Sequence, residues 1–542
     1  MDNARFILHP KRIMAEEIEL KLALAEKDQS RFLRHPLLRR AAQQPTETLD
    51  NIYYDTPDLA LQRRGIALRL RRQGGRWLQT VKLAGTSAAG LASRPEWETP
   101  YTGHFDFSTI DAEDTRAWLQ RPRLLAQLVP IFETRFRRRT WRFAASPGAV
   151  LLTLDRGWII AGEKRAALSE LELELAGAPL DALFALALPL AERMALTPAV
   201  SSKAERGYRL YTAAATQPVK AADIALSGDM PPLDAFRRIA LACLDQLQQN
   251  HAGAVATQDP EFIHQMRVAT RRLSAALRLF SPILPADFAQ PLKAAFRPLM
   301  KQLGHVRDLD VLHTEIVALV LAALPDEPRL AALSNQITLR RHHARKAAYA
   351  LLRTPGYGHM LLTALQILHG LNLTTGNAAP FPGDVPAAQP GAQPSVQPGT
   401  QPSAQPSPSL ATFAAQRLRR LNKQVMRKAR AARIDNPESL HALRIAGKRL
   451  RYALEFFSPL ASPREQRDAL RQLTRLQNTL GQLNDLAQAG DLLMDCANDD
   501  SLLREAVTLI GGWHGPRYAA LLATVPNALK SLERLHLPAL SR

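Results

Sequence analysis

Two stretches of alternating residues decide the fold of the first part of the chain: Glu17-Ile18-Glu19-Leu20-Lys21-Leu22 and Glu170-Leu171-Glu172-Leu173-Glu174-Leu175. Successive side chains of a β-strand point to opposite faces, so each stretch presents a charged face and an apolar face. This pattern is typical of an antiparallel sheet that packs on a core through one face only.

The same period of two continues over about residues 15–212, in short runs that Gly and Pro interrupt. Leu68-Arg69-Leu70-Arg71 places two arginines on one face, Thr80-Val81-Lys82 pairs a threonine with a lysine, and Leu152-Thr153-Leu154-Asp155 places Asp155 opposite leucines. Helical periodicity interrupts the strands around residues 115–128 and 180–194. The pattern predicts a strand-rich domain with a few helices.

Charged faces of single strands are most simply explained by contact with water. Taken together, however, carboxylates at i and i+2 repel one another unless a cation neutralises them. Oxygen-only ligands favour Mg²⁺ or Mn²⁺. Arginine and lysine on other strands suit phosphate oxygens. A sheet that closed with both sets inside would carry the groups needed for phosphoryl transfer to water.

Glu17-x-Glu19-x-Lys21, followed by Tyr53-Tyr54-Asp55-Thr56, resembles the CYTH superfamily, also called triphosphate tunnel metalloenzymes. The resemblance extends over about residues 16–212 and predicts a CYTH domain at 14–212. Further matching pieces are Leu68-Arg69-Leu70-Arg71, Lys82, Arg94-Pro95-Glu96-Trp97-Glu98, Arg138 before Trp141, Asp155, Glu170-Leu171-Glu172 and Ser202-Lys203.

This resemblance implies an eight-stranded antiparallel β-barrel tunnel with charged side chains inside and helices around it. The metal ligands that it implies are Glu17, Glu19, Asp155, Glu170 and Glu172. The substrate-binding residues that it implies are Lys21, Arg69, Arg71, Lys82, Arg138 and Lys203. The candidate catalytic residues are Glu17, Glu19, Lys21 and Lys82, and further tunnel candidates are Arg94, Glu96 and Glu174. Tyr54-Asp55-Thr56 is either a structural turn or a functional element.

From about Pro232 onward the texture is helical, with Leu and Ala at three- and four-residue spacing. His264-Gln-Met-Arg267 recurs as His441-Ala-Leu-Arg444, an offset of 177 residues (441 − 264) that continues over the following residues. The repeat indicates a duplicated, all-α helical bundle with halves at 225–372 and 411–535. Between them, residues 373–410 are rich in Pro, Gln and Ala, which predicts an extended, disordered insert.

Basic residues at helical spacing recur in both halves and suit backbone phosphates. These repeats resemble the CHAD domain, which implies binding of inorganic polyphosphate. The residues implied are His264, Arg267, Arg271, Arg272, His441, Arg444, Lys448 and Arg449. For the two histidines, shared packing is an equally weighted explanation.

The formal net charge of +20 indicates a polyanionic partner, although a basic proteome would also explain it. Only two cysteines occur, far apart, which excludes a disulfide framework. No signal peptide is visible, and no apolar run approaches the roughly 20 residues that span a bilayer. We therefore expect no membrane partner and a cytoplasmic location. Met14 is an alternative start, with the first 13 residues a misassigned extension.

The combination of the two resemblances, to CYTH and CHAD domains, is similar to bacterial inorganic triphosphatases. The expected activity is metal-dependent hydrolysis of inorganic triphosphate to diphosphate and phosphate, with the helical domain binding longer chains. Two alternatives stay open. The tunnel could act on thiamine triphosphate or a nucleoside triphosphate, or as an adenylyl cyclase. The chain could instead only bind polyphosphate or, less favoured, RNA.

Overall fold

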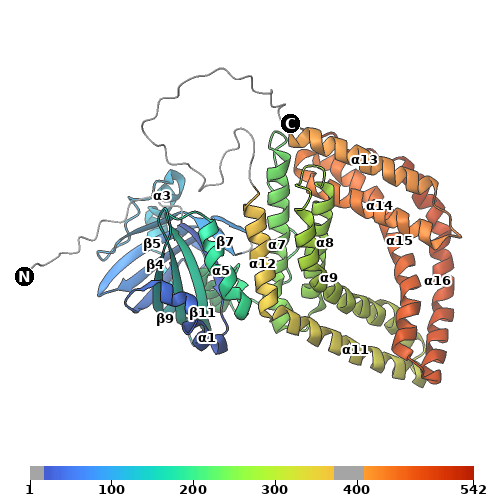
Figure 1. Cartoon of the computed structure of the whole chain (residues 1–542), viewed down its shortest axis with the longest axis horizontal. Helices are drawn as coiled ribbons and strands as arrows, with labels where there is room; N and C mark the ends of the chain where they lie inside the picture. Colours follow the sequence, from blue (N-terminus) through green and yellow to red (C-terminus); the bar gives the residue numbers. More distant parts are fainter. Residues whose placement is uncertain (1–16, 89, 372–407, 542) are drawn as a thin grey trace, which may run out of the picture. The chain divides into compact units, whose positions relative to one another are not determined.

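The computed structural model describes residues 17–88, 90–371 and 408–541, shown in Figure 1. The alternative start at Met14 and nearly all of the predicted insert 373–410 lie outside these residues. The described residues divide into two compact units. The first unit holds the chain up to Gln217 together with Thr354–Gly370, and the second holds Pro218–Arg353 and the residues from 408 onward.

The first unit is built on one antiparallel sheet, whose strands run from blue to teal in Figure 1. Its described strands are β1 (Glu17–Ala23), β2 (Ala42–Gln43), β3 (Glu47–Asp55), β4 (Ile66–Gln73), β5 (Arg76–Leu83), β6 (Thr86–Ala88), β7 (Leu91–Arg94), β8 (Glu96–Pro100), β9 (Val129–Ala144), β10 (Ala149–Ala161), β11 (Lys164–Ala176) and β12 (Thr197–Pro198). Neighbouring strands follow the order β6-β7-β1-β11-β10-β9-β3-β4-β5-β8.

The sheet closes on itself through β7 and β8. Arg94 of β7 is in register with Glu17 of β1, and Glu96 of β8 is in register with Lys82 of β5. Pro95 lies between β7 and β8. Because proline has no backbone N–H to donate to a neighbouring strand, it interrupts what would otherwise be one continuous strand. With β7 and β8 taken as one interrupted strand, the ring of described residues has the eight positions that the sequence predicts.

The apolar core of this unit lies outside the ring. Leu20 and Leu22 alternate with Glu19 and Lys21 along β1, and these leucines pack under α5 (Asp181–Arg193). The ring interior is consequently left to the charged faces. The other helices of the unit are η1 (Glu26–Asp28), α1 (Gln29–Leu33), η2 (Pro36–Arg40), α2 (Ala60–Arg63), α3 (Glu113–Leu119), α4 (Pro122–Leu125), α6 (Lys203–Thr212) and α12 (Pro355–His369).

Helix α12 joins the first unit although it follows the first set of helices in the sequence. It packs on α5 and β12, and its Leu362 belongs to the same core cluster as Leu20. A Cβ atom at Gly358 of α12 would lie 1.7 Å from the carbonyl oxygen of Leu196. Only glycine therefore allows the two backbones to approach this closely.

The second unit is all-helical. Its helices are α7 (Pro232–Ala256), α8 (Pro260–Leu279), α9 (Ala289–Val311), η3 (Leu312–Val317), α10 (Ala318–Ala323), α11 (Pro328–Leu352), α13 (Leu410–Arg430), α14 (Pro437–Phe456), η4 (Ser458–Leu460), α15 (Pro463–Ala497) and α16 (Ser501–Glu533). Long helices lie side by side as antiparallel pairs, such as α15 and α16 (Figure 1). No helix of the described chain is both long enough and apolar enough to cross a lipid bilayer.

The duplication is visible in the contacts of this unit. Helices α8 and α14 begin at Pro260 and Pro437, which keeps the offset of 177 residues (437 − 260). Arg267 lies 3.3 Å from Asp308, and the equivalent pair, Arg444 and Asp485, lies 3.8 Å apart. The fold class predicted from the sequence, an antiparallel tunnel followed by a duplicated helical bundle, is confirmed.

Candidate active site

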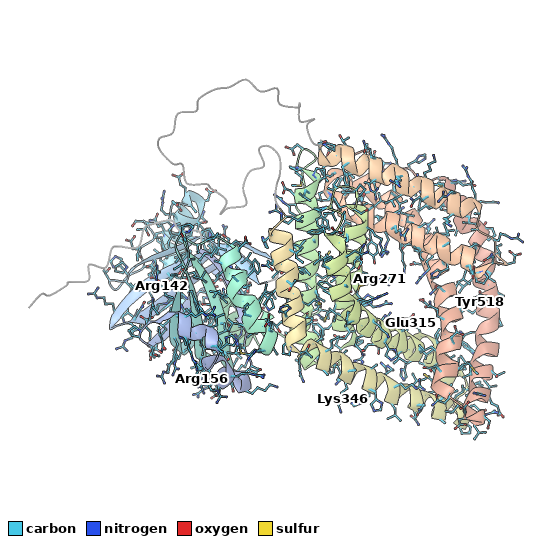
Figure 2. All side chains as sticks on the ribbon, viewed as in Figure 1. Arg142, Arg156, Arg271, Glu315, Lys346 and Tyr518 are labelled. Atoms are coloured by element: carbon cyan, nitrogen blue, oxygen red, sulfur yellow. The ribbon has the colours of Figure 1, made fainter. Side chains whose placement is uncertain are left out.

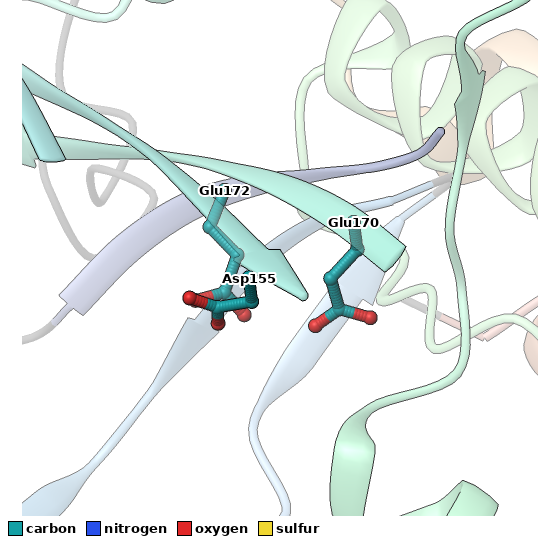
Figure 3. A group of neighbouring side chains, drawn as sticks. All are labelled: Asp155, Glu170 and Glu172. Atoms are coloured by element: carbon teal, nitrogen blue, oxygen red, sulfur yellow. The ribbon is translucent and has the colours of Figure 1, made fainter. Parts of the chain in front are cut away.

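Three carboxylates from two neighbouring strands gather inside the ring. Asp155 of β10 is in register with Glu170 of β11, and Glu172 follows two residues later on the same face. Their oxygens lie within 4.8 Å of one another, and Figure 3 shows the three side chains turned toward a common point. Asp155 and Glu170 are almost completely buried. This oxygen-only donor set fits a hard divalent cation such as Mg²⁺ or Mn²⁺.

Lys203 lies at the centre of these carboxylates. Its Nζ is 2.8 Å from Asp155 Oδ2, 2.5 Å from Glu170 Oε1 and 2.9 Å from Glu172 Oε1. Ser202 caps α6 by accepting from the backbone N–H of Glu205, so Lys203 is the first residue of that helix. Burial by itself lowers the pKa of Lys203, but the three carboxylates hold that pKa well above its ordinary value.

Arg138 of β9 neutralises the same group from the other side. It donates to both oxygens of Asp155, and its Nη2 also donates to Glu172 Oε2 at 2.8 Å. Although burial alone would raise it, the pKa of Glu172 lies well below its ordinary range because Lys203, Arg138 and Lys21 surround it. Glu172 is therefore a carboxylate at neutral pH.

A second charged group lies on β4, β5 and β8. Lys82 Nζ is 2.7 Å from Glu96 Oε2, and Arg69 Nη2 is 3.3 Å from Glu96 Oε1. Arg71 lies 3.6 Å from Glu98. Burial, together with the neighbouring Arg69, lowers the pKa of Arg71 to about 10. These side chains alternate with apolar residues that face outward, as the period of two predicts.

Most of the predicted residues meet in one cavity of about 240 Å³ within the ring. Its lining includes Glu19, Lys21, Arg69, Arg71, Lys82, Arg94, Glu96, Arg138, Glu172, Glu174 and Lys203. Asp155 and Glu170 reach this set through their contacts with Lys203. The backbone of Glu17 lies on β1, but its side chain is outside the described part of the chain.

Several residues that line the cavity or contact its carboxylates were not among the site candidates named from the sequence. Glu98 shares the face of Glu96 at i+2, and this spacing could have identified it. Arg206, one turn after Lys203 on α6, lies 3.1 Å from Glu170, and its i+3 spacing was an available signal. Phe136 and Tyr53 also line the cavity. Tyr53 belongs to a stretch that carries the CYTH resemblance, whereas nothing in its local pattern distinguishes Phe136 from a core aromatic residue.

The sequence leaves open whether Asp55 belongs to a structural turn or to a functional element, and its contacts are those of a structural turn. Its side chain accepts from the backbone N–H groups of Thr56, Leu61 and Gln62, which fixes the turn that leads into α2. The hydroxyl of Tyr208 donates to Asp55 at 2.9 Å. Asp55 therefore ties α6 to the turn after β3, and through α6 it supports Lys203.

The basic residues predicted in the second unit lie on α8 and α14, where Arg271 extends from α8 (Figure 2). Burial and the nearby Arg271 and Arg444 lower the pKa of Lys448 to about 7. Burial and other arginines likewise lower the pKa of Arg267 and of Arg444. Such mutual repulsion shows that cations from both repeats share one surface, which favours polyanions.

The other predicted members of this basic group differ in their contacts. Arg272 pairs with Glu455 at 3.3 Å and lies over the ring of Phe456, so it contributes packing between the repeats. His441 contacts Asn484 through its Nδ1 at 2.8 Å. The Nδ1 of His264 is buried without a hydrogen-bond partner among the described residues, and Arg449 is exposed.

A ring-shaped sheet with metal-fitting carboxylates and phosphate-fitting cations inside, joined to a duplicated basic helical bundle, defines the class of protein. Comparison with family models matches residues 15–208 to the CYTH domain and residues 238–494 to the CHAD domain. The chain thus belongs to the proteins that join a CYTH domain to a CHAD domain.

Individual proteins give further likenesses. An inorganic triphosphatase of Haemophilus influenzae is 31% identical over 198 residues, which cover 36% of this chain and 56% of that protein. The CHAD domain of the plant Ricinus communis is 30% identical and covers 60% of this chain and 100% of its own, with a TM-score of 0.48. A Hippeastrum protein described as a putative adenylyl cyclase with dominant triphosphatase activity is 17% identical and covers 35% of this chain and 95% of its own, with a TM-score of 0.27.

Proposed function

We propose that this chain hydrolyses inorganic triphosphate to diphosphate and phosphate with the help of Mg²⁺ or Mn²⁺. The observation that carries the proposal is the single cavity that carboxylates and phosphate-binding cations share. A pure anion-binding site would gain nothing from buried carboxylates, because they repel the anion. A metal ion reconciles the two sets of charges.

Asp155, Glu170 and Glu172 would hold the ion, together with Glu19 on the adjacent β1 and Glu17, the ligand that the CYTH resemblance adds. A bound divalent ion supplies positive charge that stabilises the phosphate oxygens and favours attack by water. The protein contributes the positions of the ligands. Because β10, β11 and β1 are hydrogen-bonded neighbours, the carboxylates are held rigidly before any substrate enters.

Lys21, Arg69, Arg71 and Lys82 would bind the phosphate chain along the cavity, with Arg138 and Lys203 nearer the carboxylates. Guanidinium groups grip phosphate oxygens in a bidentate manner, and the lysines add point charge. In this arrangement the cations hold the chain in line and stabilise the leaving diphosphate.

The size of the cavity favours an inorganic substrate. Its 240 Å³ is below the roughly 300–1,000 Å³ of pockets that enclose organic ligands. A linear triphosphate is small and carries its charge along its whole length, which matches a lining with several lysines and arginines. Thiamine triphosphate, nucleoside triphosphates and cyclase chemistry require space for an organic group at the opening of the cavity, and they are the second choice.

For the second unit we propose that the surface of α8 and α14 binds inorganic polyphosphate. Arg267, Arg271, Arg444 and Lys448 bring cations of both repeats together, and a polyanion would relieve their repulsion. Such binding depends on salt, because each phosphate contact releases counterions. A cytoplasmic location stays a prediction from the sequence.

The test is metal-dependent phosphate release from the full chain, with inorganic triphosphate, ATP, thiamine triphosphate and long-chain polyphosphate in parallel. We expect rapid release from triphosphate that requires Mg²⁺ or Mn²⁺. Asp155→Asn should lower the rate by roughly 10²–10³-fold, as the loss of other preorganised charges does. Glu133→Gln, which changes an exposed carboxylate on the outer side of β9, is the matched control. No release from any substrate, with salt-sensitive polyphosphate binding intact, would make the chain a binding protein.

A further inference from the structure

The position of Lys203 has a consequence for the metal site, and the inference drawn from it rests on the function proposed above. An ammonium group has three N–H donors. The Nζ of Lys203 contacts one oxygen from each of Asp155, Glu170 and Glu172 at 2.5–2.9 Å. These are the same three carboxylates whose oxygens could converge on a metal ion. One point in the ring is thus suited to two different cations.

Two cations cannot share that point. Unit charges a few ångströms apart inside a protein repel strongly, and a metal ion placed among the three oxygens that contact Nζ would take the position of the ammonium group. The side chain of Lys203 is only 8% exposed, so water screens this repulsion little. Binding of a metal ion must therefore be linked to departure of the ammonium group from the carboxylates.

The cavity offers the Lys203 ammonium group another position once it leaves the carboxylates. Lys203 lines the cavity together with Lys21, Arg69 and Arg71, the residues proposed to bind phosphate. Its backbone is fixed at the first turn of α6 by the capping of Ser202 and Glu205. Rotation of the side chain alone can then redirect the ammonium, without movement of the helix.

We propose that Lys203 is an internal counter-ion that competes with the divalent metal for Asp155, Glu170 and Glu172, and that it transfers to substrate phosphate when the metal binds. Metal and phosphate then bind cooperatively through Lys203: the metal releases the ammonium, and the phosphate accepts its hydrogen bonds. Without phosphate, the competition weakens metal binding.

The test measures Mn²⁺ binding to the metal-stripped full chain without substrate, by the electron paramagnetic resonance signal of free Mn²⁺. Lys203→Met is compared with Arg206→Met. Arg206 is the matched control because it lies on the same helix and pairs with Glu170, but does not bridge the three carboxylates. We expect Lys203→Met to bind Mn²⁺ about tenfold more tightly than the wild type, and Arg206→Met to change the affinity much less.

A second arm repeats the titration with inorganic diphosphate present. Diphosphate should raise the Mn²⁺ affinity of the wild type by a larger factor than that of Lys203→Met, because the variant lacks the group that links the two ligands. If Lys203→Met does not fold, as judged by circular dichroism, Lys203→Gln replaces it in both arms.

The outcomes separate this inference from the proposed function. Equal or weaker Mn²⁺ binding by the Lys203 variant would overturn the inference, and so would an equal gain in both variants, which would reveal only a general charge effect. Absence of Mn²⁺ binding in the wild type and in both variants would instead overturn the metal site of the proposed function. Neither readout depends on turnover.

Discussion

Arg138 donates two parallel hydrogen bonds to Asp155, from Nε to Oδ1 at 2.7 Å and from Nη2 to Oδ2 at 2.6 Å. The pair spans neighbouring strands, and Asp155 is completely buried. A bidentate ion pair of this kind is geometrically specific. Removal of Arg138 takes away the bidentate partner of a buried carboxylate and leaves Lys203 as its remaining cation, which costs more than the pair itself contributes.

Arg138→Met should therefore lower the free energy of unfolding by about 3 kcal/mol in chelator, measured by denaturant unfolding. Saturating Mg²⁺ should restore part of this loss in the variant, since the ion also neutralises Asp155. The control is Arg135→Met, whose partner Glu133 lies with it on the outer face. A loss that is the same with and without Mg²⁺ would indicate that Asp155 does not contact the ion.

Lys82 tests the proposed binding of phosphate by the cations that line the cavity. It lines the cavity 2.7 Å from Glu96, and a cation there would bind the substrate more strongly as charge develops in the transition state. Lys82→Met should lower kcat/KM for triphosphate by roughly 10²-fold, in steady-state assays with excess Mg²⁺. Lys164→Met removes an exposed lysine from β11 and should have little effect. An unchanged kcat/KM in Lys82→Met would place the substrate elsewhere.

Lys448 predicts a pH dependence for polyphosphate binding. Its pKa is lowered to about 7 by burial and by Arg271, Arg444 and Arg451, which outweigh the opposing effect of Asp485. The side chain of Lys448 is therefore positively charged below pH 7, and it loses this charge as the pH rises through 7. Binding should weaken between about pH 6 and pH 8, as followed by calorimetry at constant ionic strength.

The matched variants are Lys448→Arg and Lys448→Gln. Arginine keeps its charge across this range and should flatten the pH profile at high affinity. Lys448→Gln should also flatten the pH profile, but with a low affinity for polyphosphate at every pH. Burial also lowers the pKa of His264 from its ordinary value, so protonation of His264 adds charge toward the acidic side of the profile. A profile in Lys448→Gln as steep as that of the wild type would exclude Lys448 as the titrating group.

A substitution at Gly358 tests the packing of α12 against the backbone at Leu196. A methyl group at this position would meet the carbonyl oxygen of Leu196, a backbone atom that cannot rotate away. Gly358→Ala should lower the stability of the first unit by roughly 1–3 kcal/mol, the usual cost of overpacking. Gly356→Ala, in the same helix, is the control, because an added Cβ there would meet only Thr354 Oγ1 at an ordinary 3.8 Å. Equal stability of the two variants would show that α12 does not hold this contact in solution.

Periodicity alone predicts which side chains share a face of each strand, whereas the closed tunnel is expected from the CYTH resemblance. The period of two separates Glu19 and Lys21 from Leu20 and Leu22, and the leucines are found in the outer core as expected. The same rule placed Arg69, Arg71 and Lys82 on inner faces. Parity along a strand is a local property, and it is therefore readable from the sequence.

The contacts that these side chains make with distant segments cannot be predicted in the same way. No local pattern indicates that Lys203 lies among three carboxylates rather than toward the proposed phosphate-binding cations. Lys203 belongs to α6, which starts more than thirty residues after the start of β11. The division of one strand by Pro95 and the packing of α12 on α5 also depend on contacts between distant segments. Such contacts are fixed by shape and burial after the chain collapses, and a single sequence carries no periodic record of them.

The attachment of α12 also has a consequence for the order of events during protein synthesis. All the strands and α5 of the first unit precede residue 213, whereas α12 ends at His369. At about 5–20 residues per second, the ribosome needs roughly eight to thirty seconds to synthesise the residues up to the end of α12. During this interval, the apolar groove that later receives Leu362 is bare on the nascent chain. For that period the ring of strands is complete while the apolar surface that α12 covers is exposed to water.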